Sequence, residues 1–367
     1  MEKNRFYGSR LRIARIIRGH TQTELGRRIG ANVSTISRLE TGLLEPTPGL
    51  VTALSDELDF ATSFFERPII DEYTLNNCSF RSSSATPRRK HDQALARGTA
   101  FQEAVSALAM MVQLPPAALK PMKAHNVQEI EAAAEMLRIS FDLSLRAPIA
   151  SVIQLAEHAG IVVTRMRGPV EQVDAFSHYG TPPVIMLPVT NNDGAIDRVK
   201  VAHEIGHLIM GLTHVNTADA EQAAERFALA LLMPAQVFRD EFGVLPRVDW
   251  PHLFELKRRW KVPAFDILNR ALQLDFVSAT TVRRLQKQYS WRRWHQAEPY
   301  RVPLEEPELL ALALDFAERD TGETLATLAE TLGWGPTVAE ELTGMAMPDW
   351  DVFSGANVAR LDDYRRA

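Results

Sequence analysis

The spacing of apolar and polar positions predicts three short helices near the N-terminus, at residues 8–18, 22–29 and about 33–40. Thr21 and Glu24 form a capping-box pattern in front of the second of these helices. Gly30 then interrupts the pattern before the third helix begins. Two short helices joined by a tight turn that contains glycine are typical of the helix-turn-helix motif, so the first part of the chain is predicted to carry one.

The middle of the chain mixes helical periodicity with short apolar runs. Helical patterns cover residues 91–112, 127–139 and 148–158, and apolar runs typical of strands follow at residues 161–164 and 184–187. Two further helical patterns come next, and every later pattern is also helical. We find no internal repeat. The predicted fold is therefore mainly α, with a small α+β part in the middle.

Composition and charge narrow the class of protein. The 367 residues suggest two or three domains, and 46% hydrophobic with 24% charged residues is ordinary for a globular protein. The sequence shows no apolar run long enough for a membrane span and no apolar signal core, and its single cysteine excludes an intramolecular disulfide and a cysteine-rich zinc finger. We therefore expect a cytoplasmic protein. The net charge is −5, yet residues 1–43 hold nine Lys and Arg against three Glu, a local charge of +6.

The most informative motif is the H-E-x-x-H pattern at residues 203–207. On a helix, His203 and His207 project from one face, where two imidazoles can bind one tetrahedral zinc ion. Glu204 lies beside them, where a carboxylate can take a proton from an activated water as general base. The pattern predicts a catalytic zinc site.

A zinc site needs a third protein ligand, and we expect Glu221, on the next helical pattern, to supply it. Glu225, one turn later, would accept the second N–H of His203 and so orient its ring. His214 is a rival third ligand. We rank it lower because it lies beyond Gly211, where the helix is expected to stop.

These residues resemble a known family. HEIGH at 203–207 and EQAAERFALALLMP at 221–234 resemble the ImmA/IrrE family of bacterial metallopeptidases. Glu225 stands where that family usually has Asn, and either side chain can accept a hydrogen bond from a histidine. The resemblance implies a zincin-like α+β domain that cleaves a partner repressor or antitoxin and so derepresses genes for stress, phage or mobile elements.

A second resemblance covers the N-terminal helices. The segment TQTELGRRIGANVSTISRLETG, residues 21–42, resembles the Xre/lambda-repressor-like helix-turn-helix family. The resemblance implies a homodimer on double-stranded operator DNA, and it implies a set of DNA-facing residues. Base edges would be met by Val33, Ser34 and Ser37, and Arg38 could reach bases or a phosphate. Gln22 would contact a phosphate, and the charges of Arg10, Arg27 and Arg28 would lie near the DNA backbone. The alternative is a protein–protein domain of the same shape.

Several weaker candidates remain open. The strands before residue 203 would edge a cleft, where an extended peptide could add by backbone hydrogen bonds. His178 and Tyr179 could stabilise an oxyanion there, although a structural role is favoured for each ring. Residues 71–90 are predicted to be a linker or an irregular crossing; the basic run at 88–90 could touch DNA, although a solvated linker is favoured. The Trp and Arg cluster at 291–294 could bind nucleic acid or a partner, although a packing role is favoured.

The sequence therefore predicts a DNA-binding transcriptional regulator with a zinc metallopeptidase-like domain. One alternative is a catalytically inactive transcription factor that senses a ligand or metal through that domain. The other is the antitoxin or autoregulator of a toxin–antitoxin or phage module, with a toxin as partner. We expect a helix-turn-helix domain, a linker with a connecting helix, the metallopeptidase domain and a C-terminal helical domain, at residues 1–70, 71–125, 126–300 and 301–367.

Overall fold

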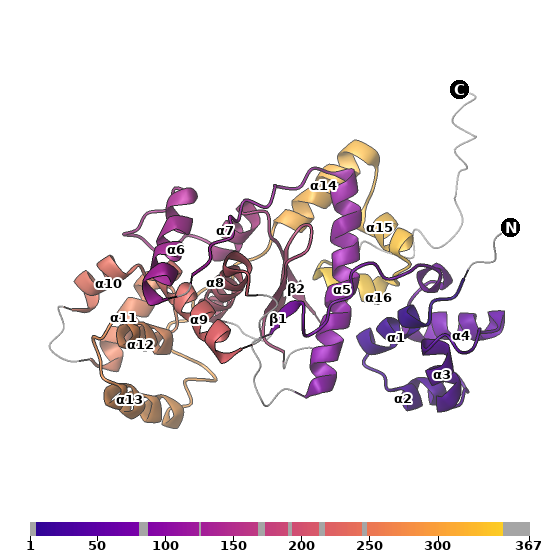
Figure 1. The fold of residues 1–367 in the computed structure, drawn as a ribbon, viewed down its shortest axis with the longest axis horizontal. Coiled ribbons are helices and arrows are strands. Elements are labelled where there is room, and N and C mark those ends of the chain that lie inside the picture. The colour runs from indigo at the N-terminus through magenta and orange to yellow at the C-terminus, as the bar shows by residue number, and fades with distance from the viewer. Residues whose placement is uncertain are drawn as a thin grey trace. The chain divides into compact units, whose positions relative to one another are not determined.

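The computed structural model describes residues 5–80, 87–124, 126–167, 173–189, 193–212, 217–243 and 248–347 (Figure 1). Contacts divide the chain into two compact units. The terminal unit combines the residues up to Ile70 with those from Leu314 onward, and the central unit is Asp71–Ala313. The predicted fold class is confirmed, because helices predominate and a small mixed sheet lies in the central unit. Within the described residues, no helix is long and apolar enough to cross a membrane.

The terminal unit begins with the predicted helices. They are α1 (Gly8–Ile17), α2 (Gln22–Arg28), α3 (Val33–Glu40), α4 (Pro48–Leu58) and the 3-10 helix η1 (Thr62–Glu66). The capping box is confirmed: the Thr21 hydroxyl accepts a hydrogen bond from the Glu24 N–H at 3.1 Å, and the Glu24 carboxylate accepts one from the Thr21 N–H at 2.6 Å. The core of these helices contains fully buried Leu11, Leu25, Ile36, Leu39, Leu54 and Phe64.

The C-terminal helices complete the terminal unit. They are α14 (Leu309–Thr321), which begins in the central unit, α15 (Leu325–Leu332) and α16 (Pro336–Thr343). The Ala61 N–H donates to the Gly333 carbonyl, and the Gly335 N–H donates to the Asp59 carbonyl, each at 2.9 Å. The Asp59 carboxylate also accepts from the Val338 N–H at 3.2 Å, which caps the start of α16. The four segments expected from the sequence remain a prediction about domain boundaries.

The C-terminal helices also repeat the spacing of the first ones, which our sequence analysis did not find. A threonine forms a capping box before α2 (Thr21) and before α15 (Thr324), and a glycine with positive φ follows each helix, Gly30 at 68° and Gly333 at 71°. Both pairs lie 303 positions apart. At the same offset, buried Leu25, Ile36 and Leu39 correspond to buried Leu328, Ala339 and Leu342. We call residues 21–41 the first repeat and residues 324–344 the second repeat.

The central unit contains a four-stranded sheet in the order β1-β3-β4-β2. The strands are β1 (Cys78–Phe80), β2 (Val162–Met166), β3 (Phe176–His178) and β4 (Val184–Pro188). β2 and β4 are parallel, and β3 is antiparallel to both of its neighbours. The two expected strands correspond to β2 and β4. The irregular linker expected over residues 71–90 is wrong at β1, because a three-residue strand is too short to show an alternating pattern.

Nine helices of the central unit lie within the described residues. They are α5 (Arg88–Met111), α6 (Val127–Ser140), α7 (Val152–His158), α8 (Gly194–Met210), α9 (Ala218–Leu232), α10 (Ala235–Phe242), α11 (Trp250–Trp260), α12 (Ala264–Gln273) and α13 (Ala279–Trp291). The basic run at residues 88–90 therefore forms the first turn of α5. Of the aromatic cluster, Trp294 packs edge-on against Trp250 at 4.9 Å between ring centroids, whereas Trp291 is exposed.

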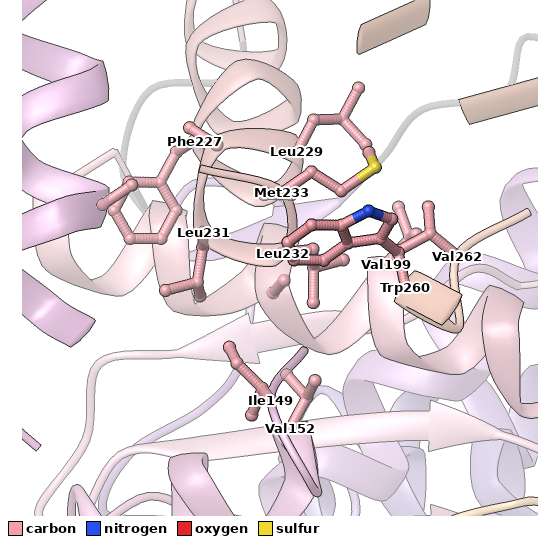
Figure 2. Packing of buried hydrophobic residues seen from close by; sticks show 14 of the residues in the cluster. Ile149, Val152, Val199, Phe227, Leu229, Leu231, Leu232, Met233, Trp260 and Val262 are labelled. Carbon is pink, nitrogen blue, oxygen red and sulfur yellow. The ribbon is translucent and has the colours of Figure 1, made fainter. Parts of the chain in front are cut away.

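The core beside α8 and α9 fixes the position of those two helices. In Figure 2, the Trp260 ring lies among Leu232, Met233 and Val262, all of which are buried. The Trp260 indole N–H donates to the Glu241 carboxylate at 2.8 Å, so the one polar group of this ring has a partner. Full burial of a large apolar side chain stabilises a fold by about 1.5–3 kcal/mol. The C-terminal end of α9 is therefore firmly anchored.

Candidate metal centre and DNA-binding face

The helix with the H-E-x-x-H motif lies directly against the helix with Glu221. α8 ends at Gly211, which has a φ of 66°, so the expected stop is confirmed. Between the two histidines, Gly206 faces α9, where a Cβ at this position would lie 2.9 Å from the Phe227 ring. A larger residue would push the helices apart. The glycine inside the motif therefore allows the close approach that brings Glu221 to the histidines.

The structure brings His203, His207 and Glu221 together. The two Nε2 atoms lie 3.0 Å apart, and each lies 3.3 Å from one carboxylate oxygen of Glu221. The candidate ligand atoms are all within 4.8 Å of one another. Both histidines are buried, while the Glu221 side chain is 23% exposed. Two neutral imidazoles and a carboxylate are a typical ligand set for a catalytic zinc ion.

These three side chains fit a bound cation. Although each Glu221 oxygen lies 3.3 Å from a ring nitrogen, neither oxygen has a hydrogen-bond partner of normal geometry among the described residues. A buried acceptor without a partner costs about 1–3 kcal/mol, which a cation would offset. Ligand atoms at bond lengths of about 2.0–2.1 Å on a tetrahedron are about 3.3 Å apart, close to the spacing observed. Burial would raise the pKa of Glu221, but the two histidines outweigh it and lower that pKa to about 2.

Glu204 is buried next to this group, with 1% of its surface exposed. Its Oε2 atom accepts a hydrogen bond from the Ser79 hydroxyl at 2.6 Å and another from the Ser177 hydroxyl at 2.7 Å. Burial raises the pKa of Glu204, and the nearby histidines and the two serine hydrogen bonds oppose that rise. A buried carboxyl group with a raised pKa suits general acid–base work.

Sequence reasoning missed the role of both serines. Ser177 belongs to no motif that the sequence analysis identified, and Ser79 lies in the stretch that was predicted to be a linker. Both are fully buried on paired strands, with their hydroxyl oxygens 2.9 Å apart. The pairing of Ser79 with Glu204 spans 125 positions of sequence. No local pattern could have indicated it.

Four weaker candidates near the centre were also predicted from the sequence. Among the hydrogen bonds between described residues, none joins Glu225 to His203, so the orienting role of Glu225 stays a prediction. His178 is buried and stacks on Tyr73 at 4.0 Å between ring centroids, whereas Tyr179 is 47% exposed. His214, the rival third ligand, lies outside the described residues.

The DNA-binding face predicted for the first repeat lies on the outside of the terminal unit. The glycine of α2 is required here, because a Cβ at Gly26 would lie 2.6 Å from the Ala31 carbonyl oxygen. This close turn sets α3 against α2. Of the predicted DNA contacts, Ser37 and Gln22 are half-buried, and the exposed ones are Arg27, Arg28, Val33, Ser34 and Arg38.

Three predicted DNA contacts have partners within the protein. The Gln22 amide donates to the Glu40 carboxylate at 2.7 Å, and Arg28 pairs with Glu57 at 3.1 Å. Arg10 is 4% exposed and donates to the Pro68 carbonyl at 2.7 Å. Its expected role near the DNA backbone is therefore wrong, because its guanidinium is used inside the fold. Gln22 and Arg28 would have to exchange a protein partner for a phosphate.

Two family models match parts of the chain. Residues 156–272 match the IrrE N-terminal-like domain of the peptidase M78 family, and residues 7–62 match a helix-turn-helix domain. No curated protein matches the chain. Both resemblances stated from the sequence are confirmed. The chain combines a helix-turn-helix DNA-binding domain with an IrrE-like metallopeptidase domain, and its His-His-Glu group is consistent with a metal ion.

Proposed function

We propose that this protein is a transcriptional regulator that binds operator DNA through the first repeat and hydrolyses a partner protein at a zinc centre in the central unit. The observation that carries the proposal is the convergence of His203, His207 and Glu221 next to buried Glu204. The helix-turn-helix match supports the DNA-binding half. A protein that acts on DNA belongs in the cytoplasm, where we place it.

In this proposal His203, His207 and Glu221 hold the zinc ion. When bound, zinc polarises a peptide carbonyl and lowers the pKa of water. Glu204 takes a proton from the attacking water and passes it to the leaving amine nitrogen, as a general base and then a general acid. Ser177 donates to Oε2 of the Glu204 carboxylate and holds that side chain in place, and Ser79 adds a second hydrogen bond to the same oxygen in the conformation described.

Metal content of the purified protein tests the centre directly. We expect about one zinc ion per chain by elemental analysis, and its loss in His207→Ala. Glu225→Ala is the matched control, because it removes a carboxylate from the same helix, one turn beyond Glu221. That variant keeps its metal if Glu225 only orients His203. A wild-type protein that binds no metal after zinc is supplied would refute the proposed zinc centre.

The substrate class follows from the family resemblance: a partner repressor or antitoxin. Cells with Glu204→Gln would keep the zinc centre and accumulate that partner uncut, whereas wild-type cells would show new protein N-termini from its cleavage. Mass spectrometry of N-terminal peptides from the two strains would identify these cleavage sites. If no cleavage site differs, and the Glu204→Gln strain regulates its genes normally, peptide hydrolysis is not the function.

A second candidate is a sensor that does not cut. The complete burial of Glu204, and its two hydrogen bonds to serines, favour this reading for the conformation described. In that case zinc or a peptide would change DNA affinity without any cleavage. Titration of operator DNA with and without zinc separates the two, since only the sensor needs a metal-dependent affinity.

We also propose that two chains bind one operator. Helix-turn-helix proteins of this kind read two half-sites about one helical turn apart. Sedimentation of the protein with a selected operator should give two chains per duplex. A single chain per duplex would contradict the dimer and leave the metal centre untouched.

A further inference from the structure

β1 occupies the outer edge of β3, one of the strands before residue 203 along which an extended peptide is predicted to bind. The strands pair antiparallel, with Cys78 opposite His178, Ser79 opposite Ser177 and Phe80 opposite Phe176. A strand edge with no partner offers backbone N–H and C=O groups to any extended segment. Here those groups are already used by the chain itself.

β1 also touches the proposed catalytic group. The Ser79 hydroxyl donates to Glu204 at 2.6 Å and lies 2.9 Å from the Ser177 hydroxyl. Ser79 and Cys78 are both fully buried. A peptide that bound along β3 would therefore have to take the place of β1, and would meet Glu204 where Ser79 now lies.

The segment that leads into β1 is held against α5. The Tyr73 N–H donates to the Thr99 hydroxyl at 2.9 Å, and the Tyr73 hydroxyl donates to the Gln102 side chain at 2.7 Å. Gly98 allows this contact, because a Cβ there would lie 2.4 Å from the Tyr73 ring. The position of β1 is thus supported from outside the sheet. Specific contacts with α5 therefore hold the segment before β1 in place.

β1 does not belong to the matched peptidase region, which begins at residue 156. It lies between the matched helix-turn-helix region, which ends at residue 62, and the matched peptidase region, which begins at residue 156. The segment that fills the edge of β3 therefore lies outside the matched peptidase region, although it belongs to the same compact unit.

We propose that residues 78–80 are an intramolecular inhibitor strand, and that the centre becomes available to a substrate only when this strand leaves β3. The inference rests on the proposed peptidase function. A substrate would bind as an extended segment in the place of the inhibitor strand. The chain's own strand competes at an effective concentration of roughly millimolar or higher, so only a tightly binding partner or a signal that loosens residues 71–80 would activate the enzyme.

The single cysteine of the chain reports release of the strand, because Cys78 lies in β1 and is fully buried. Ser79→Asp would place a second carboxylate against Glu204 and expel the strand, since two buried carboxylates in contact repel. Ser79→Ala is the matched control, which loses the hydroxyl but keeps the backbone pairing. We expect alkylation of Cys78 by iodoacetamide to be about tenfold or more faster in Ser79→Asp, and nearly unchanged in Ser79→Ala.

Peptide binding gives the second readout. The probe is a fluorescent peptide with the sequence of residues 74–80 and serine in place of Cys78. We expect its anisotropy to show binding to Ser79→Asp about tenfold tighter than to the wild type, because the competing strand has left. Equal binding to both proteins, or no binding to either while Cys78 is labelled rapidly, would overturn the proposal.

A disulfide between the strands tests the proposal without expelling β1. His178→Cys places a thiol directly opposite Cys78, where facing residues of antiparallel strands are close enough for a bond. The oxidised variant should not bind the peptide probe, and dithiothreitol should restore binding. Reduced and oxidised forms lack the same histidine, so the disulfide is the only difference. Peptide binding that is the same in both forms would contradict the inhibitor strand.

These outcomes are distinct from failure of the proposed function. A protein without zinc refutes the peptidase, whatever Cys78 does. A zinc-loaded protein in which neither the aspartate nor the disulfide changes peptide binding keeps the peptidase proposal and refutes the inhibitor strand.

Discussion

The first and second repeats each consist of two helices with matching caps and buried positions, but their surface residues differ in charge. The capping threonines, the glycines with positive φ and the buried leucines coincide at an offset of 303. The exposed positions of the first repeat do not: Arg27, Arg28 and Arg38 correspond to exposed Glu330 and Thr331 and to half-buried Glu341. Residues 322–347 contain four Glu and no Lys or Arg. Buried positions determine the motif, while exposed charge determines whether DNA is attracted to it.

The turn of the second repeat packs against the end of α4. This turn, at Gly333 and Gly335, bonds to the backbone of Asp59 and Ala61. The corresponding turn of the first repeat, at Gly30, has open space where a Cβ would lie. The same turn is therefore a packing surface in one repeat and a solvent-exposed corner in the other.

The largest expected effect comes from filling the packed turn. In Gly333→Ala the new Cβ would lie 3.0 Å from Phe64, in a backbone conformation with φ of 71°. We expect a loss of stability of about 3 kcal/mol for the terminal unit, measured by calorimetry. Gly30→Ala is the matched control, with a similar φ and no close neighbour, and should cost about 1 kcal/mol. Equal losses would show that the second turn is not packed as described.

Reversal of charge on the first recognition helix should have the next largest effect. Arg38 is exposed on α3, where it is predicted to reach bases or phosphate. We expect Arg38→Glu to weaken operator binding about 100-fold, or about 2.7 kcal/mol, measured by fluorescence anisotropy at fixed salt. Unchanged affinity for a selected operator would refute the assignment of α3 as the recognition helix.

A smaller effect should distinguish matching positions of the two repeats. Arg27 and Glu330 are both exposed and lie 303 positions apart. Arg27→Ala should weaken binding to a non-specific duplex about tenfold and reduce the dependence of log K on log salt by about 0.9, the value for one phosphate contact. Glu330→Ala should leave that slope unchanged. A changed slope in Glu330→Ala would mean that the second repeat also lies near DNA.

The smallest effect concerns the cap that joins the end of α4 to the second repeat. Asp59 has a φ of 60° and accepts a hydrogen bond from the Val338 N–H at 3.2 Å. Asp59→Ala removes the cap and leaves a residue poorly suited to this conformation, so we expect a loss of about 1 kcal/mol in thermal stability. Asp59→Asn keeps an acceptor oxygen and tolerates positive φ, and should lose less. DNA affinity of the folded protein should not change in either variant.

Much of the molecule could be predicted from the sequence because the relevant signals are local. Positions 203 and 207 share a helix face by the geometry of the helix alone, and Glu221 follows on a helix with a clear apolar stripe. The helix-turn-helix motif could also be predicted locally, because Thr21 begins its first helix with a capping box and Gly30 ends that helix. The second repeat was missed because only its spacing is preserved, and its surface residues differ from those of the first.

By itself, the sequence determined most of the helices, the capping box at Thr21 and Glu24, and the placement of His203 and His207 on one face of α8. Only the tertiary structure decided that Ser79 meets Glu204, that β1 fills the edge of β3, and that Asp59 caps α16. Such contacts join residues 96 to 279 positions apart. Helical periodicity acts over a few residues, whereas these pairings depend on the path of the whole chain through its buried core.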